Sequence, residues 1–321
     1  MSIISVKHDA AYRGCPAIAV EGGGVRVLVL PADGAKLASI TAGGREWLAE
    51  QPPARAAELG KKRVHYRRLA YGGSYVDAEC CGFDDLFPTV DPWTPDDGPF
   101  AGEEYPDHGE VCRLAYGATP CPNGVLLGAK SRRFPLVYTK QITGGEEGVT
   151  LTYRIENTGD AAFPCLWAGH CLLRGEPGAA VISPYPADAP RTIMFGPGDA
   201  AGLPADRLVG YAPGTGPAYK FYYDAPISAG RIGLRLADGR ALTFHYDAAV
   251  LPYLGVWLNN GAFQQLYTVA LEPASLPYDS PGRAGEAGYG GELAPHSALT
   301  FAVTIRCEVP SPADWAERSP T

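Results

Sequence analysis

The chain has 321 residues, 46 % of them hydrophobic and 19 % charged, so it can fill a substantial core and does not resemble a disordered, highly charged segment. Its formal net charge of -8 counts against a phosphate backbone as partner, because nucleic-acid binding needs a basic face. The 40 glycines and 30 prolines are spread along the chain without a period, which indicates many short strands and turns.

Alternation of apolar and polar residues predicts strands from the first part of the chain to its end. Successive side chains of a strand point to opposite faces, so a half-buried strand alternates with a period of two. The predicted strands include residues 25–30, 134–142, 149–155, 232–236, 242–246 and 299–306. The Asp238-Gly239 step between two of these runs is a strong hairpin signal. Helical patterns are confined to residues 54–62 and 314–318.

Two stretches are too long to be simple turns. They cover residues 83–110, which are rich in Asp and Glu, and residues 182–217, which are rich in Pro, Gly and Ala. Long loops in compact domains are usually functional or disordered, so both are candidate walls of a cleft. The acidic spacing of the first does not match a calcium loop, and we predict no metal site.

Strands recur without a composition break that would mark a linker. We therefore predict an all-β fold, mostly antiparallel, with a single domain over residues 1–309 and a C-terminal tail over residues 310–321. The tail is rich in Pro, Ser and charge and is expected to fray.

Membrane and secretory signals are absent from the sequence pattern. No stretch reaches the roughly 18 consecutive apolar residues of a membrane helix, and residues 1–10 lack the layout of a signal peptide. We predict a cytoplasmic protein without a membrane partner. In that compartment its eight cysteines are expected to be mostly reduced, and their spacing fits no metal signature.

Two histidines and one glutamate are candidates for acid–base chemistry. His108 lies in Asp-His-Gly-Glu at the exit of the first long loop, where its pKa is open to tuning. His170 is expected on a strand face beside the small Ala168. Glu272 ends a predicted strand, and the following Pro273 favours an extended backbone there. The alternatives are an exposed loop histidine, a hydrogen-bonded core histidine and a solvated edge glutamate.

An ordered series of motifs resembles the aldose 1-epimerase, or galactose mutarotase-like, superfamily. Residues 25–40 and the Gly-Arg-Glu-Trp turn at 44–47 are similar to its first hairpin. Later segments resemble its Gly-aromatic-Asp-Glu-x-Phe-Pro segment, its two histidine motifs, its Glu-Pro motif and its closing turn: residues 82–90, 107–110, 153–157 with 163–170, 271–273 and 293–295. The resemblance spans nearly the whole chain and implies a β-supersandwich with a concave carbohydrate site.

The resemblance also implies a mechanism that needs no cofactor. In the family a glutamate takes the proton of the anomeric hydroxyl and a histidine protonates the ring oxygen, so that the sugar ring opens and recloses on either face. By position, Glu272 is the general base, His170 the general acid and His108 a sugar-binding or stabilising partner. The predicted function is therefore interconversion of the anomers of a free aldose, with a small-molecule sugar as the only predicted partner.

Three further residues are expected to contact the sugar. Trp257 suits the apolar face of a pyranose, although core packing explains it equally well, and the carboxylate of Asp85 suits its hydroxyls. Arg113, together with Arg132 and Arg133, leaves a phosphorylated sugar open. Galactose is not supported as the substrate, because Cys171-Leu172-Leu173 replaces the usual residues after the second histidine and the asparagine-rich context of the first is missing.

Two other functions remain open on the sequence. One is a non-catalytic carbohydrate-binding protein of the same fold, because a fold does not fix a function. The other is a lyase or hydrolase domain, against which stands the lack of a second catalytic carboxylate beside Glu272. The oligomeric state is not predicted.

Overall fold

The computed structural model describes residues 3–50, 68–79, 81–186, 188–197, 216–264 and 266–310. The predicted helices at 54–62 and 314–318 lie outside these residues, as does nearly all of the predicted tail. Every strand pairing within them is antiparallel. The all-β prediction is confirmed.

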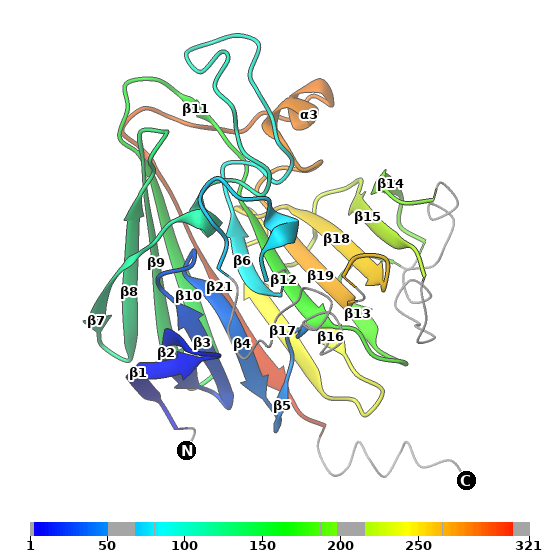
Figure 1. Cartoon of the computed structure of the whole chain (residues 1–321). Helices are drawn as coiled ribbons and strands as arrows, with labels where there is room; N and C mark the ends of the chain where they lie inside the picture. Colours follow the sequence, from blue (N-terminus) through cyan, green and yellow to red (C-terminus); the bar gives the residue numbers. More distant parts are fainter. Residues whose placement is uncertain are drawn as a thin grey trace.

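Two large sheets form the sandwich (Figure 1). The first has 11 strands in the order β1-β2-β3-β4-β6-β12-β19-β18-β15-β14, with β5 paired to β4. Its strands are β1 Ser5–Tyr12, β2 Cys15–Gly22, β3 Val25–Leu30, β4 Lys36–Ala42, β5 Arg45–Glu46, β6 Gly82–Leu86, β12 Ala168–Arg174, β14 Arg191–Phe195, β15 Ala218–Tyr223, β18 Tyr253–Asn260 and β19 Tyr267–Ala274. Strands from both halves of the chain meet in its centre, which is where the candidate site forms.

The second sheet has eight strands in the order β13-β16-β17-β21-β10-β9-β8-β7. They are β7 Gly117–Cys121, β8 Gly124–Lys130, β9 Leu136–Gly145, β10 Gly148–Asn157, β13 Ala180–Ile182, β16 Arg231–Arg235, β17 Ala241–Tyr246 and β21 Ala298–Glu308. The small remaining elements are β11 Phe163–Pro164 paired with β20 Glu292–Leu293, the 3₁₀ turns η1 Tyr75–Asp77 and η2 Val111–Arg113, and the helix α3 Pro281–Glu286.

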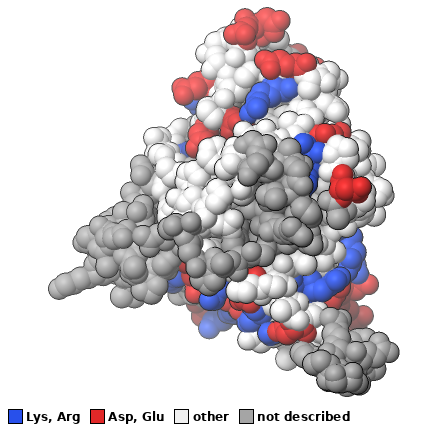
Figure 2. Space-filling model, turned by 90° about the vertical axis from the view of Figure 1, so that its right-hand side faces the viewer, with Lys and Arg blue, Asp and Glu red and all other residues white. Residues whose placement is uncertain are grey.

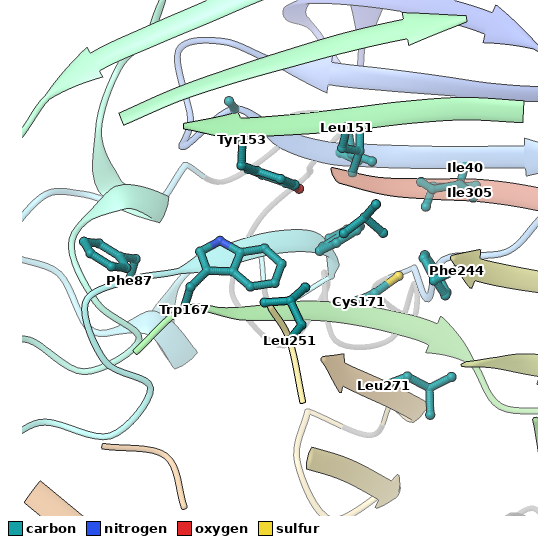
Figure 3. Close-up of a cluster of buried hydrophobic side chains, with 14 of the residues drawn as sticks. Ile40, Phe87, Leu151, Tyr153, Trp167, Cys171, Phe244, Leu251, Leu271 and Ile305 are labelled. Atoms are coloured by element: carbon teal, nitrogen blue, oxygen red, sulfur yellow. The ribbon is translucent and has the colours of Figure 1, made fainter. Parts of the chain in front are cut away.

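The core lies between the two sheets (Figure 3). Leu151 and Tyr153 of β10 are fully buried there, and Cys171 of β12 and Leu271 of β19 face them from the first sheet. Burial of apolar surface contributes roughly 25 cal/mol per Å², so this contact is the main force that holds the layers together. The same alternation turns the neighbouring residues of β12 and β19 to the opposite face of the first sheet.

Most of the predicted strands are confirmed. Residues 149–155 lie in β10 and 299–306 in β21, and the predicted hairpin joins β16 to β17, with the Gly239 amide donating to the Leu236 carbonyl at 2.9 Å. The loop predictions need correction. Strand β6 occupies the start of the first predicted loop and strand β14 lies inside the second.

The helix α3 was not predicted, because a six-residue helix carries too little periodicity to stand out. The residues at its start are nevertheless typical of a helix N-terminus. The Ser280 hydroxyl accepts a hydrogen bond from the Arg283 amide and Pro281 occupies the first turn, which are the residue types that begin helices.

No helix among the described residues is long and apolar enough to cross a membrane. The seven cysteines within the described part of the chain carry free thiols. On the described surface shown in Figure 2, acidic and basic side chains are interspersed between larger uncharged areas.

Candidate active site

The outer face of the first sheet carries polar side chains where four of its strands lie side by side. Cys171 pairs with Leu271 across β12 and β19, so the residues beside them in the chain, His170 and Glu272, are neighbours on the other face. On β15 and β18, Lys220 pairs with Trp257. Strand alternation therefore places these four side chains on one face of the sheet, in two adjacent rows, away from the core.

A hollow of about 330 Å³ opens over these four side chains. Its floor comes from the strands, and its walls come from η1, the loop after β6, strand β14 and the turns that follow β18 and β19. The lining residues are Tyr75, Val76, Val90, Asp91, His108, His170, Leu172, Met194, Phe195, Lys220, Trp257, Asn259, Phe263, Gln264, Leu266, Thr268, Glu272 and Asp279. Both loops predicted as cleft walls contribute to it, through Asp91 and His108 in the first and Met194 and Phe195 in the second.

Four of the six predicted site residues meet in this hollow, although they are far apart in the sequence. His108, His170, Trp257 and Glu272 all line it. The imidazole Nε2 of His170 lies 3.9 Å from Oε1 of Glu272. The rings of His108 and His170 are 5.6 Å apart in an edge-on arrangement.

The carboxylate of Glu272 is fully buried and faces two different environments. Its Oε2 accepts a hydrogen bond from the ammonium of Lys220, whose Nζ also lies 3.2 Å from Oδ1 of Asp279. Its Oε1 has no hydrogen-bond partner among the described residues. A buried acceptor without a partner is costly, so Oε1 is a natural place for a hydroxyl donor of a ligand.

Burial and the neighbouring charges act against each other in this group. Burial raises the pKa of Glu272, and the Lys220 ammonium opposes that rise. For Lys220, burial disfavours the charged form, but Asp279 and Glu272 outweigh it and raise its pKa above the ordinary value. Lys220 is therefore an ammonium ion, and it stabilises the ionised form of Glu272.

His170 is held from its other side by η1. The hydroxyl of Tyr75 lies 3.2 Å from His170 Nδ1 and donates to Oδ2 of Asp84 at 2.8 Å. Asp84 pairs with His170 across β6 and β12, so both project from the same face of the sheet. Burial lowers the pKa of His170 well below its ordinary value, and His108 and Lys220 lower it further. Without a ligand the imidazole is therefore neutral near pH 7.

His108 enters the hollow from a tight turn rather than from a strand. It has a positive φ of 59°, and its ring stacks on Tyr75 with 3.8 Å between the centroids. The guanidinium of Arg113 holds this turn, because it donates to the carbonyls of Asp107 (2.6 Å), Gly109 (3.0 Å) and Gly73. Arg113 was predicted to contact the sugar. In the structure its Nε, Nη1 and Nη2 atoms donate to backbone carbonyls, and it is not among the residues that line the hollow.

Asp85 does not line the hollow either. It is fully buried in the core and its Oδ2 accepts from Lys140 at 2.9 Å. Asp85 is next to Asp84 in β6, and adjacent strand residues face opposite sides. Asp84 therefore points to the side of the hollow, whereas Asp85, the residue predicted to contact the sugar, points between the sheets.

Aromatic rings form one wall. Trp257 lies 5.7 Å from Phe195 and 5.3 Å from Phe263 between ring centroids. The two phenylalanines are 47 % and 41 % exposed, which is unusual for such large apolar side chains. An exposed apolar cluster at the edge of a polar hollow is typical of a binding surface.

Three residues of the site were missed by sequence reasoning. Lys220 could have been found, because a single charge inside the aromatic run Ala-Tyr-Lys-Phe-Tyr-Tyr needs a buried partner or a ligand. Asp279 lies in a turn with a positive φ of 67°, and Tyr75 belongs to a three-residue 3₁₀ turn. No local pattern marks either of them.

The arrangement suits proton transfer. A carboxylate oxygen and an imidazole nitrogen face the same hollow, and each is supported from behind by a charged or hydroxyl group. Among the described residues, no group of three or more His, Cys, Asp or Glu side chains is placed to hold a metal ion.

No family model matches the sequence, and no curated protein matches it. Solved structures match the fold over nearly the whole chain. A Klebsiella pneumoniae protein provisionally named an aldose 1-epimerase has a TM-score of 0.68 at 16 % identity, covering 98 % of this chain and 85 % of that one. The Slr1438 protein from Synechocystis sp. PCC 6803 has a TM-score of 0.64 at 18 % identity, covering 97 % and 100 %.

A galactose mutarotase-like protein from Clostridium acetobutylicum has a TM-score of 0.62 at 13 % identity and covers 96 % of this chain and 99 % of that one. At such identities the matches show the arrangement of the strands and not the chemistry. The fold implied by the sequence motifs is confirmed: this chain has the galactose mutarotase-like fold.

Proposed function

We propose that the protein is an aldose 1-epimerase-like isomerase, which interconverts the anomers of a free aldose by opening and reclosing the ring. The observation that carries the proposal is the gap between Glu272 and His170. Glu272 Oε1 is buried without a hydrogen-bond partner among the described residues, and it lies 3.9 Å from His170 Nε2. A hemiacetal has a hydroxyl donor and a ring-oxygen acceptor on the same carbon, which is the pair of groups that this gap can accept.

The proton transfers in the proposed cycle balance without a cofactor. The cycle starts from the form in which the Glu272–His170 pair holds its shared proton on Nε2 of His170. Glu272 takes the proton of the anomeric hydroxyl while His170 Nε2 gives its proton to the ring oxygen. The bond between C1 and the ring oxygen breaks and the C1 carbonyl forms. After rotation about C1–C2, the two residues reverse their roles and the ring closes on the other face. A positioned acid or base contributes about 10²- to 10⁴-fold each.

The neighbours of each group support this assignment. The ammonium of Lys220 contacts Glu272 and favours the carboxylate that a base requires. On the other side, the Tyr75 oxygen lies 3.2 Å from His170 Nδ1 and provides an acceptor for the imidazolium that an acid requires. Burial acts in the opposite direction, because it favours the form in which Glu272 holds the shared proton and His170 is neutral. The two forms hold the same number of protons, so the pair titrates as one unit.

The aromatic wall favours a pyranose with one apolar face. Trp257, Phe195 and Phe263 lie within 6 Å of one another between ring centroids, and such rings pack against the C–H groups of a sugar. Opposite them, the carboxylates of Glu272, Asp279 and Asp91 line the hollow. Oxygen acceptors of this kind suit sugar hydroxyls better than a phosphate group, with which they would repel each other.

Anomer exchange measured by polarimetry tests the proposal. Freshly dissolved single anomers of glucose, galactose, xylose and arabinose are followed with and without protein. The wild-type protein is expected to accelerate exchange of at least one of them. Glu272→Gln should lower the acceleration by about 10²- to 10⁴-fold, whereas Glu308→Gln on β21, far from the hollow, should leave it unchanged.

Calorimetric titration with the same sugars separates the alternative function. Saturable binding by a wild-type protein that accelerates no anomer exchange would favour a carbohydrate-binding protein of this fold. A Glu272→Gln variant that runs at the wild-type rate would overturn the mechanism.

A further inference from the structure

We infer that Tyr75 and Asp84 are positioning residues that keep a proton on Nδ1 of His170, so that every proton exchanged with the substrate passes through Nε2. The inference rests on the proposed function for its catalytic meaning. The arrangement of hydrogen bonds can be tested without any activity. It begins with the single proton of the Tyr75 hydroxyl, for which two described neighbours lie within hydrogen-bond distance.

The two neighbours are Oδ2 of Asp84 at 2.8 Å and Nδ1 of His170 at 3.2 Å. An ionised carboxylate has no proton and can only accept. If the hydroxyl donated to the imidazole, its oxygen would face the carboxylate oxygen at 2.8 Å with no proton between them. Two such acceptors repel each other, so the hydroxyl donates to Asp84.

Asp84 is held in its ionised form by Lys36, whose Nζ lies 3.1 Å from the same Oδ2. Both side chains are buried. Burial raises the pKa of Asp84, and the ammonium and the Tyr75 hydroxyl oppose that rise only in part. An ammonium and a proton donor directed at one oxygen identify that oxygen as a carboxylate acceptor.

With its proton directed at Asp84, the Tyr75 oxygen can only accept from His170. Nδ1 of His170 therefore carries a proton in both the neutral and the charged imidazole. Nε2, which faces Glu272 at 3.9 Å, is the nitrogen that gains or loses one. When Nε2 is protonated, the hydrogen bonds from Asp84 through Tyr75 stabilise the imidazolium. When Nε2 is not protonated, it offers a lone pair to the hydroxyl that was the ring oxygen, and so accepts its proton as the ring closes.

The placement of Tyr75 fits this role. Its hydroxyl lies between β6 and β12, and its ring is clamped by the stacked ring of His108 at 3.8 Å between centroids. Tyr75→Phe keeps the stacked ring and removes only the hydroxyl. Tyr116→Phe is a matched control, because the Tyr116 hydroxyl is also buried and donates to a backbone carbonyl at 3.3 Å, away from the hollow.

Imidazole nitrogen NMR tests the hydrogen-bond direction directly. The protein, with its six histidines labelled with ¹⁵N, is recorded above the ordinary imidazole pKa, and the His170 signals are assigned by their loss in His170→Asn. We expect the pattern of a neutral ring protonated on Nδ1. A ring protonated on Nε2 in the wild-type protein would overturn the inference, whatever the protein catalyses.

Kinetics of anomer exchange then test the catalytic meaning. Tyr75→Phe is expected to lower kcat by at least about tenfold with KM within about twofold, and to reduce the Nδ1 preference in the NMR spectrum. Tyr116→Phe is expected to change neither. If Tyr75→Phe kept the wild-type kcat, the catalytic part of the inference would be wrong even though the proposed function stood.

Asp84→Asn should reverse the direction of the hydrogen bonds that run through Tyr75 to His170. The amide can donate to the Tyr75 oxygen, which then turns its own proton to Nδ1 and leaves the proton of His170 on Nε2. In the serine protease triad the same carboxylate-to-amide exchange favours the wrong tautomer and lowers kcat by about 10⁴-fold. A folded Asp84→Asn variant with the wild-type tautomer would contradict the inference. If this variant does not fold, Tyr75→Phe still decides it.

Discussion

Lys220 shows how one side chain can set both the chemistry and the stability of a site. Its ammonium contacts the carboxylates of Glu272 and Asp279, and all three groups are buried. In this buried cluster a single ammonium is shared by two carboxyl groups. The ionised state of Glu272 therefore depends on Lys220 more than on solvent.

Lys220→Met tests that dependence. Methionine has a similar length without the charge, so the pKa of Glu272 should rise further and its carboxylate should form only at higher pH. The acidic limb of the activity profile is expected to move upward by at least about one pH unit, with at least a tenfold loss near neutral pH. Lys130→Met, an exposed lysine on β8, is the control. An unchanged pH profile would contradict this role.

The stability of Lys220→Met should depend on pH in the same sense. Breaking a buried ion pair costs about 3–5 kcal/mol because it leaves an uncompensated charge. A carboxyl whose pKa is raised on folding is stabilising below its unfolded pKa, and that contribution is lost as pH rises through the folded pKa. The free energy of unfolding of the variant, measured by denaturant titration, is therefore expected to fall further behind the wild type at pH 8 than at pH 5.

At the scale of single residues, the sequence pointed to the groups that we propose as reacting better than to the groups that support them. His108, His170 and Glu272 are recognisable because each carries its own motif. Lys220 and Glu272 are 52 positions apart in the chain, and their contact depends on the order β15-β18-β19 in the sheet. Local periodicity indicates strands but not their order in a sheet, so the contact between Lys220 and Glu272 could not be found from the sequence.

At the scale of strands, adjacent residues of β6 separate two functions. Asp84 and Asp85 are chemically identical, and the sequence alone does not say which one faces the core. Asp84 supports His170 through Tyr75, whereas Asp85 joins β6 of the first sheet to Lys140 on β9 of the second, with 2.9 Å between the charged atoms. Alternation along β6 decides which of the two carboxylates faces the core, and Asp85, which was predicted to contact the sugar, is the one that does.

Asp85→Ala is expected to destabilise the fold without a direct effect on the proposed sugar site. Removing one partner of the fully buried pair leaves the Lys140 ammonium uncompensated, which should cost about 3–5 kcal/mol in denaturant unfolding. The KM of the remaining folded protein should stay within about twofold of wild type. A large rise in KM with unchanged stability would instead restore Asp85 as a sugar ligand. Asp9→Ala on the exposed strand β1 is a control for stability.

At the scale of the whole molecule, the sandwich buries many groups that ionise only at high pH. Tyr116, Tyr138, Tyr153 and Tyr222 are fully enclosed, and burial raises the pKa of each well above its ordinary value of 10.0. Burial also raises the pKa of the Cys165 thiol from 9.0 to about 12. The alternation of the strands that makes the core thus places phenol and thiol groups where they cannot ionise without unfolding.

The alkaline limit of stability follows from these groups. A phenol whose pKa is higher in the folded state contributes fully below pH 10 and loses its contribution as pH rises above that value, because the unfolded chain can release the proton and the folded chain cannot. Each such group lowers the free energy of unfolding by about 1.4 kcal/mol per pH unit, so four together remove about 5 kcal/mol per unit. With a total stability of about 5–15 kcal/mol, unfolding is expected within roughly one to three pH units above pH 10.

Parallel titrations of tyrosinate absorbance and far-ultraviolet circular dichroism measure this limit. Exposed tyrosines should ionise first with the structure intact, and the buried phenols should ionise in one cooperative step that coincides with the loss of the strand signal. The same titration in concentrated urea, where all 18 tyrosines are accessible, should show a single ordinary transition. If the buried phenols ionised while the strand signal persisted, the burial of these four rings in the folded protein would be wrong.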